Sequence, residues 1–174
     1  IIPSDDKRIN SLLEIVKERE FQGYSYDGAG ASFEILAKNI LDAVPTFFSV
    51  ENFEVTISGK KDEHSLSKAK ISLNVDNRII NSVGEGNGPV NALDNALRKD
   101  LGIYNEYIQD LVLLDYKVRI LDGGTEAITR VVIESSDSNN QSWFTVGIST
   151  NIIEASFEAL MDSINYKLLK SGIK

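Results

Sequence analysis

Residues 83–97 read Val-Gly-Glu-Gly-Asn-Gly-Pro-Val-Asn-Ala-Leu-Asp-Asn-Ala-Leu, and residues 146–160 repeat their pattern of small and apolar positions. The offset is 63 residues at three matched pairs, which are Gly84 and Gly147, Ala92 and Ala155, and Ala96 and Ala159. The same offset places the alternating string 53–57 on the alternating string 116–120. The sequence therefore predicts a duplicated unit, and such a duplication tends to form a pseudo-two-fold module with a site at its seam.

The composition is that of a globular protein. With 174 residues, of which 42% are hydrophobic, the chain can bury a core as one or two small domains. A formal net charge of -8 and a pI of about 4.7 repel phosphate groups, and no local Lys/Arg cluster compensates. We therefore expect no nucleic-acid partner and no anionic membrane partner.

The chain contains no cysteine, which excludes disulfides, a thiolate nucleophile and thiolate metal ligands. This composition suits a reducing compartment, and we expect a cytoplasmic protein. No apolar run approaches the roughly 20 residues that span a bilayer. Residues 1–6 include neither an initiator Met nor a secretory signal pattern, so we interpret the chain as a piece of a longer protein.

The N-terminal part of the chain is predicted to form two helices. Apolar side chains at helical spacing indicate a helix over 5–22, with Ser4 as its N-cap. A second helix is expected over 31–43, because Pro45 disfavours helix at the residue before it. A helix pair buries little by itself, so we interpret residues 1–45 as a helical linker subdomain, with a flap packed on a neighbour as the alternative.

From residue 46 onward the hydrophobic period changes from helical to alternating. Residues 46–174 are predicted to form one domain of two βββα units, over about 47–108 and 110–172, so the fold class is α+β. The remaining apolar surface must be covered, and we expect a homodimer. The predicted strands and helices lie near 53–57, 69–75, 79–83 and 89–101, and near 113–121, 127–134, 143–147 and 152–169.

Side-chain periodicity predicts which way several residues face. Trp143 and Phe144 are neighbours on one predicted strand, so one should be buried and the other should face outward. The predicted helices should each bury one stripe, which consists of Val90, Leu93, Leu97 and Leu101 in the first unit and of Ile153, Ser156, Leu160 and Ile164 in the second.

The glycine-rich turn 84–88 leads into a predicted helix, whose N-terminus could bind an anion. The turn lacks the Gly-Lys-Ser/Thr of a P-loop and the spacing of the dinucleotide fingerprint, which disfavours nucleotide binding. The alternative is a tight strand-to-helix turn that needs positive φ. Because the equivalent turn, 147–151, keeps one glycine, we expect the first turn to have an additional reason to bring its backbone close to another group.

No residues stand at spacings that specify a catalytic site. Glu85, Asp122 and Glu126 are acids in or near loops, without a second group to form a general acid–base pair. His64 is the single histidine and lies in a polar connection, which excludes a histidine-based metal cluster and a serine triad. We therefore predict no catalytic residue, no metal ligand and no cofactor in this chain.

One predicted strand has an apolar face made of Tyr116, Val118 and Ile120. Core packing is one explanation of such a face. Beside the predicted turn over 123–127, the same face would also form a small apolar pocket edged by backbone donors and acceptors. That chemistry suits an aliphatic amino acid.

Three separated motifs carry a family resemblance. They are Gly86-Asn87-Gly88-Pro89-Val90-Asn91-Ala92, Leu114-Asp115-Tyr116-Lys117-Val118-Arg119-Ile120, and Val146-Gly147 followed by Asn151-Ile152-Ile153-Glu154-Ala155-Ser156. Over about residues 46–170 the chain resembles the C-terminal regulatory domain of the 2-isopropylmalate synthase and citramalate synthase family. The second and third motifs favour the citramalate synthase branch.

The resemblance implies a dimerising domain that binds an end-product amino acid and inhibits a separate TIM-barrel catalytic domain, which uses acetyl-CoA and a divalent metal. The effector would be isoleucine for a citramalate synthase or leucine for a 2-isopropylmalate synthase. A purely structural dimerisation domain is the alternative from another class. By position, the resemblance implies effector contacts at Gly86, Gly88, Val90, Leu113, Tyr116, Ile120, Gly124 and Ala127.

Overall fold

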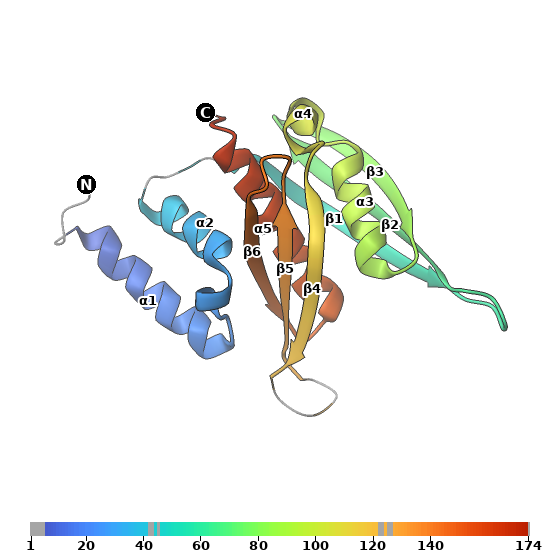
Figure 1. The fold of residues 1–174 in the computed structure, drawn as a ribbon, viewed down its shortest axis with the longest axis horizontal. Helices are drawn as coiled ribbons and strands as arrows, with labels where there is room; N and C mark the ends of the chain where they lie inside the picture. Colours follow the sequence, from blue (N-terminus) through green and yellow to red (C-terminus); the bar gives the residue numbers. More distant parts are fainter. Residues whose placement is uncertain (1–5, 42–43, 45, 122–123, 125–126, 174) are drawn as a thin grey trace. The chain divides into compact units, whose positions relative to one another are not determined.

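A computed structural model describes residues 6–41, 44, 46–121, 124 and 127–173. The chain divides into two compact units. The first-repeat unit contains residues 46–110 and 170–173, and the second-repeat unit contains the residues before 46 together with 111–169. Each unit is built on one three-stranded antiparallel sheet with a helix that follows it, so the predicted α+β class and the βββα repeat are confirmed (Figure 1).

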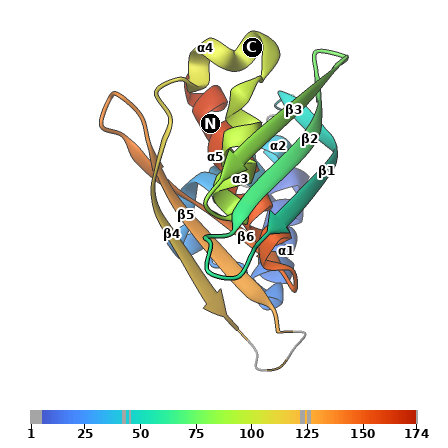
Figure 2. The same cartoon turned by 90° about the vertical axis from the view of Figure 1, so that its right-hand side faces the viewer.

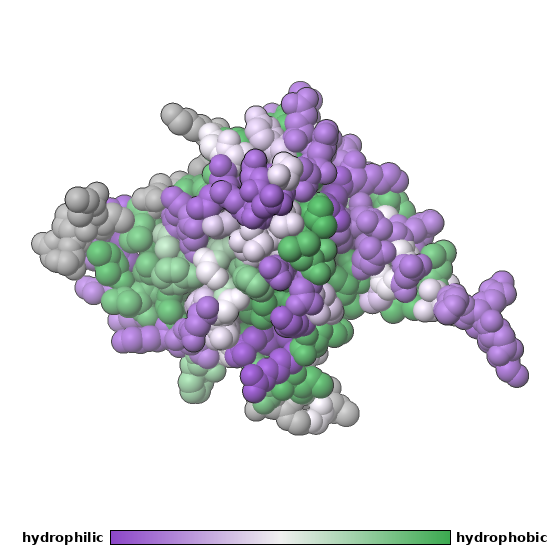
Figure 3. Space-filling view, viewed as in Figure 1, coloured by the Kyte–Doolittle hydropathy of each residue, from purple (hydrophilic) through white to green (hydrophobic). Residues whose placement is uncertain are grey.

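The first-repeat unit contains the strands β1 (Phe48–Ser58), β2 (Leu66–Val75) and β3 (Arg78–Gly86), which pair in sequence order. Asp76 and Asn77 join β2 to β3, and both have positive φ, as a two-residue type I′ turn requires. Figure 3 shows hydrophilic residues over the β1–β2 connection, where the chain is rich in charged side chains.

Helix α3 (Pro89–Lys99) covers one face of this sheet and is followed by the short helices η2 (Gly102–Tyr104) and α4 (Asn105–Ile108), which were not predicted (Figure 2). Ala69, Ile71 and Leu73 of β2 are buried beneath α3. The opposite face is polar and includes two ion pairs. Lys68 Nζ lies 3.7 Å from Glu85 Oε1, and Lys70 Nζ lies 3.8 Å from Glu54 Oε2. The alternation along β2 thus separates an apolar face from a solvated one.

The second-repeat unit contains β4 (Val112–Ile120), β5 (Thr129–Ser136) and β6 (Ser142–Ser149), again paired in sequence order, and α5 (Ile152–Lys170) on one face. Helices α1 (Lys7–Gln22), η1 (Tyr26–Gly28) and α2 (Gly30–Leu41) lie beside the edge strand β6 (Figure 1). Tyr26, Ala29 and Val146 form a buried cluster that joins these helices to β6. The side chains of Trp143 and Phe144 are 6% and 37% exposed, as the predicted alternation requires.

The glycines of the repeat are explained by close contact between strand and helix. A Cβ added to Gly84 would lie within 3.0 Å of backbone atoms of Ala92 and Ala96. The same addition at Gly147 would lie within 3.0 Å of backbone atoms of Ala155 and Ala159, which are the residues 63 positions later. The repeat therefore preserves a packing contact in which only hydrogen and methyl side chains fit.

The constant offset holds for the outer strands and fails at the middle one. A β-bulge lies between Val50 and Asn52 in β1, and an equivalent bulge lies between Leu113 and Asp115 in β4. In the middle strands, however, Val55 pairs with Ala69 whereas Val118 pairs with Val131. Matched residues of β2 and β5 are thus 62 positions apart, and the longer β5–β6 turn restores the offset of 63.

Several predicted boundaries differ from the structure. Helix α1 begins at Lys7, because the side chain of Asp6 accepts a hydrogen bond from Arg8 N and caps it. Helix α3 ends at Lys99, so Leu101 follows the helix, although its side chain is fully buried. Strand β5 continues to Ser136, beyond the strand predicted near 127–134. The predicted cap Ser4, the predicted end of the second helix at 43 and Pro45 lie outside the described residues.

The division of the chain at residue 45 into a linker and a regulatory domain stays a prediction. In the structure, α1 and α2 belong to the same compact unit as the second βββα repeat. Ser32 of α2 donates a hydrogen bond to Asp162 of α5 at 2.6 Å, and Tyr24 donates one to Glu158 of α5 at 2.6 Å. The helical segment is thus held to the second repeat by buried and half-buried polar contacts.

Candidate functional site

The eight residues predicted to contact an effector are distributed over both units. Gly86, Gly88 and Val90 belong to the first-repeat unit, at the end of β3 and the start of α3. The other five belong to the second-repeat unit, along β4 and the connection that follows it, and are Leu113, Tyr116, Ile120, Gly124 and Ala127.

The β-bulge in β4 places three of these residues on one face of the sheet. Leu113 and Tyr116 are three positions apart, so a regular strand would point them to opposite faces. Because of the bulge, Leu113, Tyr116 and Ile120 pair with the β5 residues Ser135, Ile133 and Thr129, which share one face. Ser163 of α5 donates a hydrogen bond to Ser135 at 2.6 Å, so this face is the one that α5 covers.

Tyr116 is held by a hydrogen bond to α5. Ser156 Oγ donates to Ile152 O at 2.6 Å, which leaves Ser156 Oγ to accept from the Tyr116 hydroxyl at 2.8 Å. Farther along β4, Val118 and Ile120 are 41% and 65% exposed. The apolar face therefore begins against α5 and ends in exposed aliphatic side chains, which can contact an aliphatic ligand.

Gly124 has a structural reason to be glycine. Its φ is 118°, a left-handed backbone conformation that side chains disfavour, and the position is exposed. Ala127 is half-buried beside it in sequence, just before β5. The acids Asp122 and Glu126 of the predicted turn lie outside the described residues.

The glycine turn before α3 differs from the prediction. None of Gly84, Gly86 and Gly88 has positive φ, so the predicted backbone reason for these glycines is wrong. Gly86 is needed because an added Cβ would lie 2.8 Å from Ala92 N and against the Asn91 side chain. Gly88 is extended, with φ of -158°, and an added Cβ would meet no atom within 4 Å among the described residues. Packing within the unit therefore accounts for Gly86 and leaves Gly88 unexplained.

The polar contacts between the helical segment and the second repeat were not predicted. Ser32 Oγ accepts from Val146 N at 3.0 Å, and Glu158 Oε2 accepts from Ile148 N at 3.0 Å. Both amides belong to the outer edge of β6, where no further strand of the described residues pairs. These side chains satisfy edge amides that would otherwise be open to another strand. Burial and the nearby Glu158 carboxylate raise the pKa of Tyr24 above its ordinary value.

Asp162 makes the stability of this contact depend on pH. Burial and, to a smaller extent, the Glu158 charge raise the pKa of Asp162 to about 7, although the hydrogen bond from Ser32 acts to lower it. A raised carboxyl pKa means that the folded state holds a proton that the unfolded state has lost, so stability falls as pH rises from about 4 to 7.

Asp162→Asn removes this titration while keeping an oxygen that accepts from Ser32. We expect the variant to be more stable than the wild type at pH 8, by up to about 4 kcal/mol, with a smaller difference at pH 5. Urea unfolding at the two pH values measures this. An equal change in the free energy of unfolding at both pH values would contradict the assignment.

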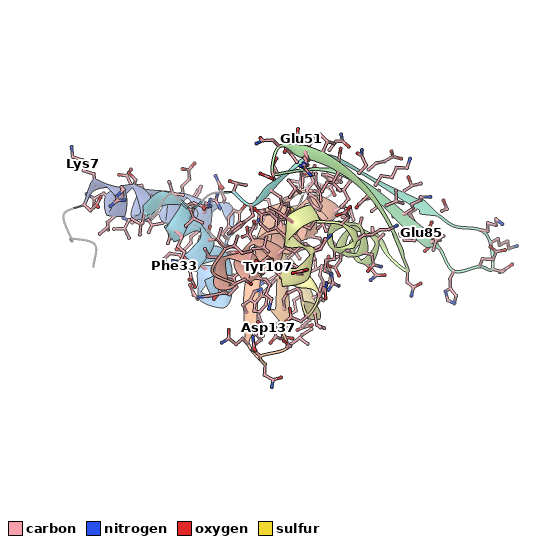
Figure 4. The ribbon with its side chains drawn as sticks, turned by 90° about the horizontal axis from the view of Figure 1, so that it is seen from above. Lys7, Phe33, Glu51, Glu85, Tyr107 and Asp137 are labelled. Carbon is pink, nitrogen blue, oxygen red and sulfur yellow. The ribbon has the colours of Figure 1, made fainter. Side chains whose placement is uncertain are left out.

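In the part of the chain that the structure describes, no group of three or more His, Asp or Glu side chains could hold a metal ion. Glu85 is exposed on the polar face of β3, next to Lys68 (Figure 4). His64 is exposed in the β1–β2 connection. Over residues 6–41, 46–121 and 127–173, no helix combines the length and apolar character needed to cross a membrane.

Comparison with known families identifies the domain. The LeuA allosteric (dimerisation) domain matches residues 28–168, which is most of the chain. The chain belongs to this family. This family match confirms the resemblance that the three sequence motifs indicated.

Proteins similar to this LeuA allosteric domain include (R)-citramalate synthases and a 2-isopropylmalate synthase. It is 47% identical to the (R)-citramalate synthase of Geobacter sulfurreducens over 171 residues, covering 97% of the chain and 32% of the relative. It is 41% identical to the (R)-citramalate synthase of Streptomyces coelicolor over 172 residues, which again cover 97% of the chain and 32% of the relative. It is 32% identical to the 2-isopropylmalate synthase of Ruminiclostridium cellulolyticum, over 75% of the chain and 23% of the relative. The chain thus spans about a third of the length of the citramalate synthases that it matches.

Proposed function

We propose that this domain is the regulatory part of a citramalate synthase and binds isoleucine as a feedback inhibitor. The observation that carries the proposal is the identity of 47% and 41% to two (R)-citramalate synthases over 97% of the chain. The parent protein would be a cytoplasmic acyltransferase that uses acetyl-CoA and a divalent metal. The domain would form a homodimer and act on a separate catalytic domain.

The geometry of each unit supports the chemistry of an amino-acid ligand. Val118 and Ile120 expose aliphatic surface on the face of β4 that also carries Tyr116. The start of α3 has a glycine N-cap, and helix starts offer backbone donors to an anion. Inhibition further requires that isoleucine bind one state of the parent enzyme more tightly than another, because equal affinity for two states shifts no equilibrium.

Two other functions have an observation in their favour. Leucine binding is favoured by the 32% identity to a 2-isopropylmalate synthase. A purely structural dimerisation domain is favoured by the hydrogen bond of Tyr116 to Ser156, which gives Tyr116 a packing role without any ligand. Isoleucine and leucine differ only in the position of a branch, so a pocket separates them by only about 1–3 kcal/mol.

Thermal unfolding with each candidate amino acid tests the proposal. We expect isoleucine to raise the melting temperature of the dimeric chain most, with smaller shifts for leucine and valine, because a ligand stabilises the folded state that binds it. A larger shift with leucine would favour the 2-isopropylmalate synthase assignment. An unchanged melting temperature with all three amino acids, in a chain shown to be dimeric by analytical ultracentrifugation, would favour a purely structural dimerisation domain.

A further inference from the structure

The sheet faces that lie away from α3 and α5 carry different charges at matched positions of the repeat. In the first-repeat unit, Thr56 of β1, Lys68 of β2 and Glu85 of β3 lie side by side in one row across the three strands. Lys68 Nζ lies 3.7 Å from Glu85 Oε1. The first copy of the repeat therefore neutralises the cation of this row within the row itself.

The corresponding row of the second-repeat unit consists of Arg119 of β4, Arg130 of β5 and Ile148 of β6. Its two outer residues follow their counterparts by 63 positions, and Arg130 follows Lys68 by the 62 positions that separate the middle strands. A second cation thus replaces the threonine, and an aliphatic side chain replaces the acid. The row has two positive charges and no negative one.

Arg119 and Arg130, which we call the arginine pair, stand directly opposite each other on neighbouring strands. Like charges in this position destabilise a sheet. Burial and the Arg119 charge lower the pKa of Arg130 below its ordinary value, so the two charges interact. The chain has 26 acidic and 18 basic side chains, which makes an unneutralised pair of cations unexpected. An anion that contacts both guanidinium groups would remove the repulsion.

The acids on the same face of this sheet act on another cation. Asp115 Oδ2 lies 2.8 Å from Lys117 Nζ. The hydrogen bond to Asp115 and, to a smaller extent, the Glu134 charge raise the pKa of Lys117. Neither member of the arginine pair has a carboxylate partner among the described residues. The nearby acids thus neutralise Lys117 and leave the arginine pair without an anion.

The arginine pair keeps hydrogen-bond donors for a ligand. Arg130 Nε donates to Gly23 O at the end of α1, at 2.6 Å, which fixes one edge of its guanidinium group. Its two terminal amino groups, and all the N–H groups of Arg119, have no acceptor among the described residues. Arg119 is exposed and Arg130 is half-buried, so a ligand can reach both from solvent.

We infer that Arg119 and Arg130 form a binding site for a phosphate group, in which both guanidinium groups donate to the phosphate oxygens. The planar fork of arginine matches the geometry of phosphate oxygens. A phosphate group carries close to two negative charges at neutral pH and balances both cations, whereas a carboxylate carries one. The inference goes beyond the proposed amino-acid binding, because Tyr116 and Ile120 lie on the opposite face of the same sheet.

Calorimetric titration of the 174-residue chain with inorganic phosphate at low ionic strength tests the site. We expect saturable binding to the wild type and at least tenfold weaker binding to Arg119→Thr, which gives the row the threonine of the first copy. The melting temperature of ligand-free Arg119→Thr should stay equal or rise, because the repulsion is removed. Equal phosphate affinity in the wild type and in this variant would overturn the inference.

Lys68→Gln is the matched control for the loss of one positive charge. Lys68 stands at the position of Arg130 in the other copy of the repeat, where Glu85 already neutralises it. The dissociation constant for phosphate should therefore change less than about twofold in this variant. An equal loss of affinity in Lys68→Gln and Arg119→Thr would show a general effect of net charge and would overturn the site.

The charge of the ligand provides an independent test. A phosphate monoester takes up its second proton near pH 6, whereas sulfate keeps two charges. Phenyl phosphate should therefore lose affinity between pH 7.5 and pH 5 by about fivefold relative to sulfate, which controls for titration of the protein. Acetate should bind at least tenfold more weakly than phosphate at pH 7.5. Acetate binding as tight as phosphate binding would contradict the phosphate assignment.

Two further measurements locate the ligand and identify its source. Titration with phosphate should shift the Nε–H NMR signals of Arg119 and Arg130, and phosphate binding that leaves both signals unchanged would overturn the inference. Tighter binding of phenyl phosphate supports a phosphate ester as the ligand, and tighter binding of inorganic phosphate supports the free ion. If phosphate does not bind and a glutamate-rich peptide binds in a manner that Arg119→Thr abolishes, the pair contacts a protein and the phosphate site is wrong.

Discussion

Gly147→Ala is expected to lower the free energy of unfolding of the second-repeat unit by about 3 kcal/mol or more. The added methyl group would lie within 3.0 Å of backbone atoms of Ala155 and Ala159. Backbone atoms of a helix cannot move aside as a flexible side chain can, so α5 would have to shift from the sheet. Trp143 is the single tryptophan and is buried in this unit, so its fluorescence during urea unfolding measures the effect.

A matched control separates the clash from the general effect of replacing glycine. Gly30, the first residue of α2, has no atom within 4 Å of its Cβ position among the described residues. Gly30→Ala should therefore change stability by less than about 1 kcal/mol, with a gain favoured, because alanine suits a helix better than glycine. If Gly147→Ala lowers the free energy of unfolding by less than about 1 kcal/mol, the packing explanation of the repeat is contradicted.

Asp137→Ala is expected to destabilise the same unit by about 3 kcal/mol. Asp137 lies in the β5–β6 turn and accepts a hydrogen bond from Lys167 of α5 at 2.9 Å, with side chains that are only 7% and 9% exposed (Figure 4). It also accepts from Asn139 N at 2.9 Å. Removing the carboxylate leaves the Lys167 cation buried without this anion and the Asn139 amide without this acceptor.

The pH dependence of this ion pair has a defined sign. The hydrogen bond from Lys167 is the main cause that lowers the pKa of Asp137. A lowered carboxyl pKa stabilises the fold at neutral pH, and this contribution disappears as pH falls below about 4. The destabilisation by Asp137→Ala should therefore be smaller in acid than at pH 7.

An exposed ion pair offers the control for this prediction. Lys60 Nζ lies 3.8 Å from Glu63 Oε2, and the two side chains are 79% and 64% exposed. Glu63→Ala should change the free energy of unfolding by less than about 0.5 kcal/mol. Similar losses of unfolding free energy in Asp137→Ala and Glu63→Ala would show that burial does not strengthen the pair of Asp137 with Lys167.

The repeat could be predicted because its cause is local. A strand that approaches a helix backbone this closely accepts only glycine, and the helix positions beneath it accept only alanine, so Gly147, Ala155 and Ala159 form a visible pattern. The location of Tyr116 and Ile120 on one face followed from strand alternation in the same way.

The features that were missed have causes that leave no pattern in neighbouring residues. Alternation assumes a regular pleat, so the bulge that places Leu113 on the face of Tyr116 could not be derived from it. Ser32 is an ordinary polar residue on a helix, and its partner Asp162 lies 130 residues away. Positive φ is one explanation that the sequence offers for the glycine turn, because it is a common reason for glycine, whereas Gly86 is required by close packing on Asn91.

We expect this LeuA allosteric domain to sense an aliphatic amino acid, with isoleucine as the effector. Calorimetric titration of the dimeric 174-residue chain with isoleucine measures this binding. Saturable heat is expected for isoleucine, with weaker binding of leucine and valine. The absence of binding heat with all three amino acids would contradict it.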